Sequence, residues 1–309
     1  MASGELTYKA PSVDLDPSLY HLDDEEKAFF QELVGITDEE ELKEHIIKVQ
    51  AKAFKIFGYP CIQNLRFLKL KIARLPAYKH ALTLLNERKD PILLDLGYCF
   101  GNDIRKAVCD GWPVEHVIAS DLQQGFWDCG HELFKSTQDT FPAAFVGGDI
   151  FDPLVLAPRG AFIESADIDI SNSRPVPRLR ELKSLTPLQG KLSVIHATSF
   201  FHLFSEEKQL ELAHLVSSLL LPKPGSIIFG SHVAMPTKGV QRVQERNRNM
   251  FCHSPESWRD IWLEVFSNGD GKGKTRVKIE SRLVQTAKKD DCQVNGGDIW
   301  HMYWSVTRI

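Results

Sequence analysis

Residues 92–101 have the sequence Ile-Leu-Leu-Asp-Leu-Gly-Tyr-Cys-Phe-Gly, and this stretch decides the fold of the 309-residue chain. A short apolar run that ends in an acid and a glycine is typical of a parallel strand buried on both faces. Glycines at the end of such a strand let the backbone approach a ligand closely, at the start of the next helix. We therefore expect a strand, a turn and a helix here, with a ligand site at the turn.

Further apolar runs follow, and helical patterns lie between most of them. The predicted strands after the first span residues 117–121, 145–150, 192–197, 226–231, 275–284 and 300–307. Alternation of strands and helices predicts an α/β fold with a parallel sheet covered on both faces. Only a polar segment separates the last two predicted strands, so we expect that pair to be antiparallel.

Before residue 92 the sequence predicts helices only. Between Leu42 and Ile56, apolar residues recur at spacings of three and four, the pattern of a helix with one buried stripe. Thr37 and Glu40 fit a capping box at the start of that helix. The other predicted helices span residues 23–34, 62–74 and 77–87.

The change of pattern divides the chain into a tail and helical cap, residues 1–88, and a core, residues 89–309. Within the core, the connection after residue 152 is longer than a link between strand and helix needs. We expect its proline- and arginine-rich part, at about 159–182, to be an inserted surface loop. The polar stretch 241–249 fits either a lid or a solvent-exposed helix.

Composition narrows the possible functions. The net charge is −4, whereas a nucleic-acid-binding protein is usually basic. No apolar run is long enough to span a bilayer, and no secretory signal is visible at the amino terminus. The six cysteines form no Cys-x-x-Cys pair, so we expect no metal site and a reducing, cytoplasmic location.

Acidic residues follow three successive predicted strands: Asp95, Asp121 and Asp149. The carboxyl ends of parallel strands meet at one edge of the sheet, where such folds bind nucleotides. Taken singly, Asp121 and Asp149 also fit helix N-caps. The turn lacks the dinucleotide fingerprint G-x-G-x-x-G, and the acid two residues before Gly97 would repel a pyrophosphate.

An acid at the turn suits a ligand with an ammonium group instead. S-adenosylmethionine carries an ammonium and a sulfonium group and no phosphate, so the turn favours this cofactor over NAD. We expect the backbone at Gly97 and Gly101 to approach it. Asp121 is then placed to accept hydrogen bonds from the ribose hydroxyls, and Asp149 from the adenine amino group, with Ile150 or Phe151 packed on the ring.

The order of these residues resembles class I methyltransferases, and most closely a fungal group that acts in polyketide and meroterpenoid biosynthesis. The resemblance runs from about residue 62 to the carboxyl terminus. Its motifs are residues 95–106 (Asp-Leu-Gly-Tyr-Cys-Phe-Gly-Asn-Asp-Ile-Arg-Lys), 120–122 (Ser-Asp-Leu), 148–152 (Gly-Asp-Ile-Phe-Asp), 195–197 (Ile-His-Ala), 200–204 (Phe-Phe-His-Leu-Phe), 221–225 (Leu-Pro-Lys-Pro-Gly) and 257–258 (Ser-Trp).

This resemblance implies a Rossmann-like sheet and S-adenosylmethionine as cofactor. We expect Leu122 beside the cofactor, and His196 either beside it or in the core. It also implies that the acceptor atom is an oxygen, often of a carboxylic acid. Two features depart from the pattern. Cys99 stands where many class I enzymes have a glycine, and the insertion at 159–182 is longer than the usual connection.

The residues after the strand at 192–197 are expected to face the transferable methyl group. His202 fits a general base for a hydroxyl acceptor, or a residue that caps a helix or orients the substrate. Phe200 and Phe201 fit an apolar acceptor wall or core packing. Trp258 fits a pocket wall or a helix packed on the sheet. Arg66 fits a surface ion pair, or a partner for a carboxylate of acceptor or cofactor.

Together these features predict an O-methyltransferase for a small-molecule acceptor, with a carboxylic acid favoured over a phenol. We expect no nucleic-acid or membrane partner, and the sequence leaves the oligomeric state open. One alternative is methylation of nitrogen or of a protein, although His-Ala-Thr-Ser at 196–199 replaces the Asn-Pro-Pro-Tyr type of element. Another is a cofactor-binding regulator that has lost catalysis.

Overall fold

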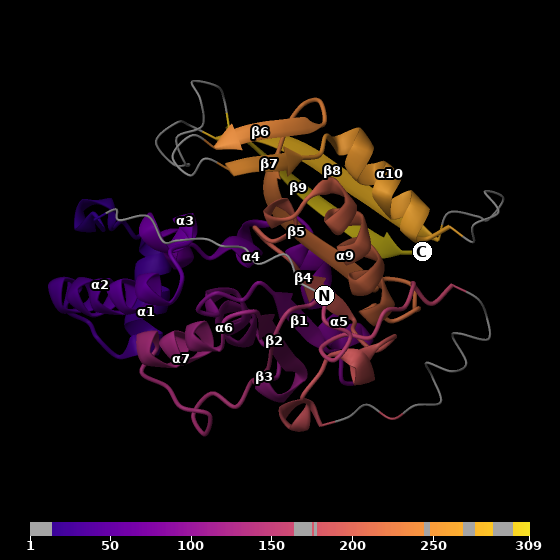
Figure 1. The fold of residues 1–309 in the computed structure, drawn as a ribbon. Coiled ribbons are helices and arrows are strands. Elements are labelled where there is room, and N and C mark those ends of the chain that lie inside the picture. Colours follow the sequence, from indigo (N-terminus) through magenta and orange to yellow (C-terminus); the bar gives the residue numbers. More distant parts are fainter. Residues whose placement is uncertain (1–13, 164–174, 176–177, 244–247, 268–275, 287–298) are drawn as a thin grey trace.

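A seven-stranded sheet forms the centre of the computed structural model (Figure 1), in the order β3-β2-β1-β4-β5-β9-β8. The structure describes residues 14–163, 175, 178–243, 248–267, 276–286 and 299–309. The strands of the sheet are β1 (Leu93–Leu96), β2 (Val117–Asp121), β3 (Ala144–Gly147), β4 (Val194–His196), β5 (Ile227–Ala234), β8 (Val277–Thr286) and β9 (Ile299–Arg308). Strands β1 to β5 are parallel, and β9 is antiparallel to both β5 and β8. The predicted α/β fold with an antiparallel last pair is confirmed.

Helices cover both faces of this sheet. They are α5 (Tyr78–Glu87), α6 (Asn102–Cys109), α7 (Gln124–Leu133), α9 (Glu206–Leu219) and α10 (Pro255–Val265). Alternate strand residues enter opposite cores: Leu94 packs in the core that contains α9 and α10, and Leu93 in the core that contains α5 and α6. Burial on both faces explains why the strands are continuous apolar runs rather than alternating patterns.

The amino-terminal helices share a third core with the strand–helix part. They are α1 (Asp24–Val34), α2 (Glu39–Ile56), α3 (Pro60–Gln63) and α4 (Lys71–Arg74). Phe30 of α1 stacks on Phe134, just after α7, with ring centroids 5.5 Å apart. Figure 1 shows α1 and α2 beside α7, and their buried residues form one cluster with Phe100 and Phe126. The division of the chain at residue 88 stays a prediction, but the two parts are not separated by solvent.

Two predictions about the helical part are wrong. Helix α2 begins at Glu39 rather than after a Thr37 cap, because Asp38 is the N-cap and its Oδ1 accepts the Glu41 N–H at 2.9 Å. The predicted helix 62–74 is broken into α3, a 3₁₀ turn (Arg66–Leu68) and α4. The break lies at Leu65, whose φ is +55°. The apolar residues of this segment are divided between two cores, since Leu65 and Leu68 pack with α1 and α2 and Ile72 packs with α5 and α6, so they do not form one helix face.

The structure describes part of each of two further segments of the core. Of the stretch 241–249, residues 241–243 belong to β6 (Gly239–Val243) and residues 248–249 to β7 (Arg248–Cys252); these strands pair antiparallel, so the predicted helix is wrong there. The insertion at 159–182 falls largely outside the described residues. At its described end Leu179 and Leu182 are buried in the core, whereas Arg178 and Glu181 are exposed, so the inserted surface loop stays a prediction. Among the described residues, no helix is both long and apolar enough to cross a membrane.

Candidate active site

The turn between β1 and α6 brings backbone to the carboxyl edge of the sheet. Gly97 and Gly101 have φ values of +74° and +75°, which favour glycine, and Cys99 between them has +53°. The Gly97 N–H donates to the Ser120 carbonyl oxygen at 3.0 Å, which ties the turn to β2. A Cβ atom at Gly97 would lie 2.8 Å from the Phe200 ring. Glycine is therefore required at this position by both backbone conformation and space.

Asp121 holds the turn from the end of β2. Its Oδ2 accepts the Cys99 N–H at 3.1 Å and its Oδ1 accepts the Gln123 N–H at 3.0 Å. Burial raises the pKa of this carboxyl to about 6, against the opposing effect of those two hydrogen bonds. Helix α7 has Gln123 at its N-cap, so Asp121 is not a helix cap. The next residue, Leu122, is 50% exposed, which leaves an apolar side chain open at this edge.

Asp149 and Ile150 lie beyond the end of β3. The Asp149 side chain is exposed and accepts the Phe151 N–H at 3.0 Å, in a local turn rather than a helix cap. Ile150 is buried and belongs to the core that contains α9 and α10. The structure thus places the Asp149 carboxylate at the predicted edge, and most of the Ile150 side chain beneath it.

Asp95 is the most enclosed of the three acids. Its Oδ1 lies 2.7 Å from Nδ1 of His196 at the end of β4, and both side chains are buried. His196 Nε2 lies 2.7 Å from the Thr198 hydroxyl oxygen. Burial acts to lower the pKa of His196, but the charge and hydrogen bond of Asp95 outweigh it and raise that pKa. The Asp95 carboxylate is therefore held by the protein, and its binding of an ammonium group stays a prediction.

The predicted acceptor residues divide into two groups. The first group is His202 and Phe200. His202 lies in a 3₁₀ turn (Phe201–Leu203), where its Nδ1 accepts the Val233 N–H at 3.4 Å. The half-buried Phe200 contacts the Gly97 turn. Phe201 and Trp258 have no exposed surface, and their ring centroids lie 5.0 Å apart within an aromatic cluster. The structure favours core packing for this second pair.

The helical cap reaches the site through α3, α4 and the turn between them. The interaction between the thiols of Cys61 and Cys99 lowers the pKa of Cys61 to about 7 and raises that of Cys99. Asp103, in the first turn of α6, accepts the Ile72 N–H at 2.8 Å. These contacts fix the cap against the turn that carries Gly97 and Gly101.

Two cations of the cap, Arg66 and Lys71, lie near His301 of β9. Lys71 donates from Nζ to the Ser199 hydroxyl at 3.4 Å. Burial, followed by the charges of Lys71 and Arg66, lowers the pKa of His301 to about 4. Sequence analysis identified Arg66 but missed Lys71. Its one sequence signal is a lysine placed directly between the apolar residues Leu70 and Ile72.

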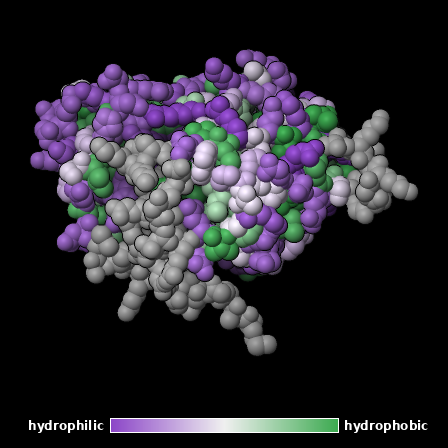
Figure 2. Space-filling view, turned by 90° about the horizontal axis from the view of Figure 1, so that it is seen from above, coloured by the Kyte–Doolittle hydropathy of each residue, from purple (hydrophilic) through white to green (hydrophobic). Residues whose placement is uncertain are grey.

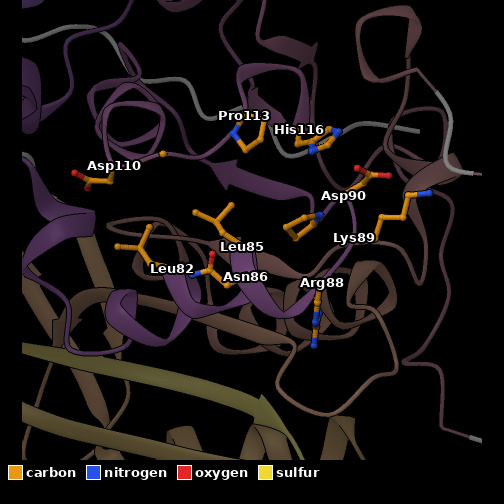
Figure 3. Close-up of a pocket in the computed structure, with 11 residues that line it drawn as sticks. Leu82, Leu85, Asn86, Arg88, Lys89, Asp90, Asp110, Pro113 and His116 are labelled. Carbon is orange, nitrogen blue, oxygen red and sulfur yellow. The ribbon is translucent and has the colours of Figure 1, made fainter.

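Two hollows in the surface help to locate the site. One, of about 320 Å³, is lined by Leu122, Gly147 and Leu182 and adjoins the ends of β2 and β3. The larger, of about 690 Å³, is lined by residues such as Asp90 and His116 (Figure 3), directly before β1 and β2. It therefore opens at the amino edge of the sheet, away from the three acids.

Two further observations concern the surface and metal ligands. Seen from the side of the β6–β7 hairpin, apolar surface occurs in scattered groups rather than one patch (Figure 2).

Within the part of the chain that the structure describes, no cluster of three or more His, Cys, Asp or Glu residues is arranged to hold a metal ion.

Comparison with known proteins identifies the family. Residues 14–68 match a family described as meroterpenoid methyltransferase N-terminal domain. The O-methyltransferase phiE of Fungal sp. (strain ATCC 74256) is 31% identical over 234 residues, which cover 76% of this chain and 68% of phiE. The Asnovolin E/Chermesin D methyltransferase nvfJ of Aspergillus novofumigatus (strain IBT 16806) is 30% identical, over 73% of this chain and 70% of nvfJ. The chain belongs to this family of fungal methyltransferases.

This methyltransferase is a class I enzyme that uses S-adenosylmethionine to methylate a small molecule, as the sequence resemblance implied. Likeness to solved structures is more distant. An S-adenosylmethionine dependent methyltransferase from Mesorhizobium loti is 12% identical with a TM-score of 0.41, over 77% of this chain and 100% of that one. We draw no functional conclusion from that likeness.

The carboxyl edge of the methyltransferase fits its cofactor chemically. The turn at Gly97 leaves no room for a side chain, and the exposed Leu122 offers an apolar surface for a flat ring. Each Asp121 oxygen accepts one backbone hydrogen bond and keeps a second lone pair for a hydroxyl donor. Adjacent strand ends thus offer acceptors for hydroxyl groups, an apolar surface for a ring and a turn whose backbone is accessible to a ligand.

Proposed function

We propose that the acceptor of this methyltransferase is a small organic acid, and that the methylated atom is a carboxylate oxygen. The observation that carries the proposal is the Val233 N–H donated to His202 Nδ1 at 3.4 Å. A neutral imidazole that accepts at Nδ1 carries its proton on Nε2. His202 then presents a donor rather than a base to its surroundings. A carboxylic acid is already ionised at neutral pH and needs no base, whereas a phenol has a pKa near 10.

The charges of the cap support the same acceptor. Arg66 and Lys71 are both cations and lie close enough to His301 to lower its pKa. A cationic surrounding stabilises an anionic acceptor before transfer. The relative named O-methyltransferase phiE is consistent with oxygen as the acceptor atom.

The roles of the remaining residues follow from their positions. When bound, S-adenosylmethionine supplies a methyl group activated by its sulfonium. We infer that Asp121 accepts hydrogen bonds from the ribose hydroxyls and that Leu122 packs against the adenine ring. Phe200, in contact with the Gly97 turn, excludes water between the turn and the acceptor. Because a carboxylate has no proton to lose, the chain has to align the reactants and remove water, and moves no proton.

A panel of aromatic and aliphatic acids, with matched phenols, tests the proposal by product identification. Methyl esters are the expected products. His202→Gln should reduce the rate less than about tenfold. At saturating S-adenosylmethionine, so that the titration of Asp121 does not limit binding, the rate should be flat near pH 6.5, where a histidine base titrates. His116→Gln, at the amino edge of the sheet, is the matched control. Methyl ethers as products, with a rate loss of about 10²–10⁴-fold in His202→Gln, would contradict the proposal.

A further inference from the structure

Lys71 differs from the two other cations beside it in the chain. Lys69 and Arg74 both bind the carboxylate of Glu26, which has no exposed surface, with nitrogen–oxygen distances of 2.7 Å. Lys71 lies between them but points to the Ser199 hydroxyl, 3.4 Å away. In the described parts of the chain, no carboxylate lies within 4.0 Å of its ammonium nitrogen. The fold thus satisfies two cations with a buried acid and directs the third into the site.

Ser199 is itself held in an unusual conformation. Its φ is +57°, in the left-handed region that costs a residue with a Cβ atom about 1 kcal/mol or more. Its N–H donates to the Ser231 carbonyl oxygen at 2.6 Å, which fixes this conformation at the end of β4. The neighbouring Phe200 contacts the Gly97 turn. A strained serine, a cation without a carboxylate partner and the cofactor turn therefore lie together.

We propose that Lys71 and Ser199 form a carboxylate-binding subsite, in which the ammonium and the hydroxyl both donate to one carboxylate. An ammonium group and a hydroxyl supply the charge-assisted hydrogen bonds that this anion takes. Two ligands of the reaction carry the group: the amino-acid end of the cofactor and the acceptor acid. The second source rests on the proposed function, and the first does not.

Binding measurements on the full chain separate the two sources. S-adenosylhomocysteine carries the amino-acid carboxylate, and 5′-methylthioadenosine lacks it. 2-Naphthoate and 2-naphthamide form an equivalent pair for the acceptor side and are measured on protein saturated with S-adenosylhomocysteine. The variants are Lys71→Met, which removes the charge, and Lys71→Arg, which keeps it. Lys79→Met, exposed on α5, is the control.

Lys71→Met should weaken one carboxylate ligand by about 10- to 100-fold, leave its neutral partner unchanged, and be rescued in part by Lys71→Arg. Loss for S-adenosylhomocysteine assigns the subsite to the cofactor, and loss for 2-naphthoate assigns it to the acceptor. Equal affinities of Lys71→Met and wild type for both carboxylate ligands, or equal losses for carboxylate and neutral ligands, overturn the proposal. Should Lys71→Met not fold, Ser199→Ala provides the same comparison, with an expected loss of about 3-fold.

None of these measurements requires turnover. The proposed function is judged from the methylated product, so a methyl ether would remove the acid acceptor and leave the cofactor source of the subsite intact. Conversely, methyl esters formed by an enzyme whose Lys71→Met variant binds every carboxylate normally would retain the proposed function without this subsite.

Discussion

Lowering the pH should weaken cofactor binding through Asp121. Burial holds the pKa of this carboxyl at about 6, although the N–H groups of Gln123 and Cys99 act to lower it. The ionised carboxylate is the form that accepts ribose hydroxyls, so affinity should be constant above pH 7 and fall below pH 6. One pH unit below a pKa of 6, about one carboxyl in eleven is ionised, and S-adenosylhomocysteine should bind about tenfold more weakly at pH 5 than at pH 7.5.

Titration calorimetry across this pH range is the assay, and Asp121→Asn is the comparison. The asparagine variant should bind about 10- to 100-fold more weakly at pH 7.5 and lose the dependence on pH, because its amide does not titrate. His196 also has a raised pKa, and a dependence that persists in Asp121→Asn would assign the titration to the Asp95–His196 pair. Constant affinity of the folded wild type between pH 7.5 and 5 would refute the ribose assignment.

The same shift has a consequence for stability. A carboxyl whose folded pKa lies above its unfolded value near 3.9 destabilises the fold once it ionises. For Asp121 this cost is absent below about pH 3.9 and complete above about pH 6, and it amounts to at most about 3 kcal/mol. At pH 7.5, Asp121→Asn should therefore lose at most about 1 kcal/mol of unfolding free energy relative to wild type, which is the contribution of the one backbone hydrogen bond that its amide nitrogen cannot accept. Denaturant unfolding measures this difference.

Three further predictions concern the cap and the turn. Glu26→Gln should lower the free energy of unfolding by about 3 kcal/mol in urea, because two cations lose a fully buried partner, and a loss under 0.5 kcal/mol would contradict that role. Gly97→Ala should weaken S-adenosylhomocysteine binding at least tenfold; Gly35→Ala, with a similar φ of +72° and nothing within 4 Å of the new Cβ, is the control and should bind normally. Cys61, with a thiol pKa of about 7, should react with maleimide at pH 7.5 faster than the exposed Cys109, whose pKa is raised. S-adenosylhomocysteine should slow the labelling of Cys61. Peptide mass spectrometry measures both effects, and faster labelling of Cys109 would contradict the prediction.

The sheet was predictable because its strands obey one simple rule. A strand buried on both faces is continuously apolar, and β1 at Leu93–Leu96 lies within the predicted run. The same rule explains the failure at 62–74. There Leu65, Leu68 and Ile72 are all buried although the chain between them is not one helix. The helical spacing of apolar residues therefore did not predict a helix correctly in this segment.

The candidate site was predictable only where it follows the strand ends. Asp121 and Leu122 lie at the predicted edge because the end of a parallel strand fixes the position of the next residues. Lys71 could not be found this way, because its partner Ser199 is 128 residues further along the chain. Their approach depends on how α4 packs against α6. The buried state of Phe201 and Trp258 likewise reflects packing between α10 and the sheet, which sequence spacing alone leaves open.

The core shared by the first two helices and α7 constrains the order in which a nascent chain can fold. Helices α1 and α2 leave the ribosome before α7, but their apolar stripe is completed by Phe126 and Phe134, which are synthesised later. Until then Phe30 lacks its contact with Phe134, and the incomplete apolar surface remains open to chaperones or to other nascent chains. The amino-terminal helices should therefore acquire protease resistance only after α7 has emerged, together with the first half of the sheet rather than ahead of it.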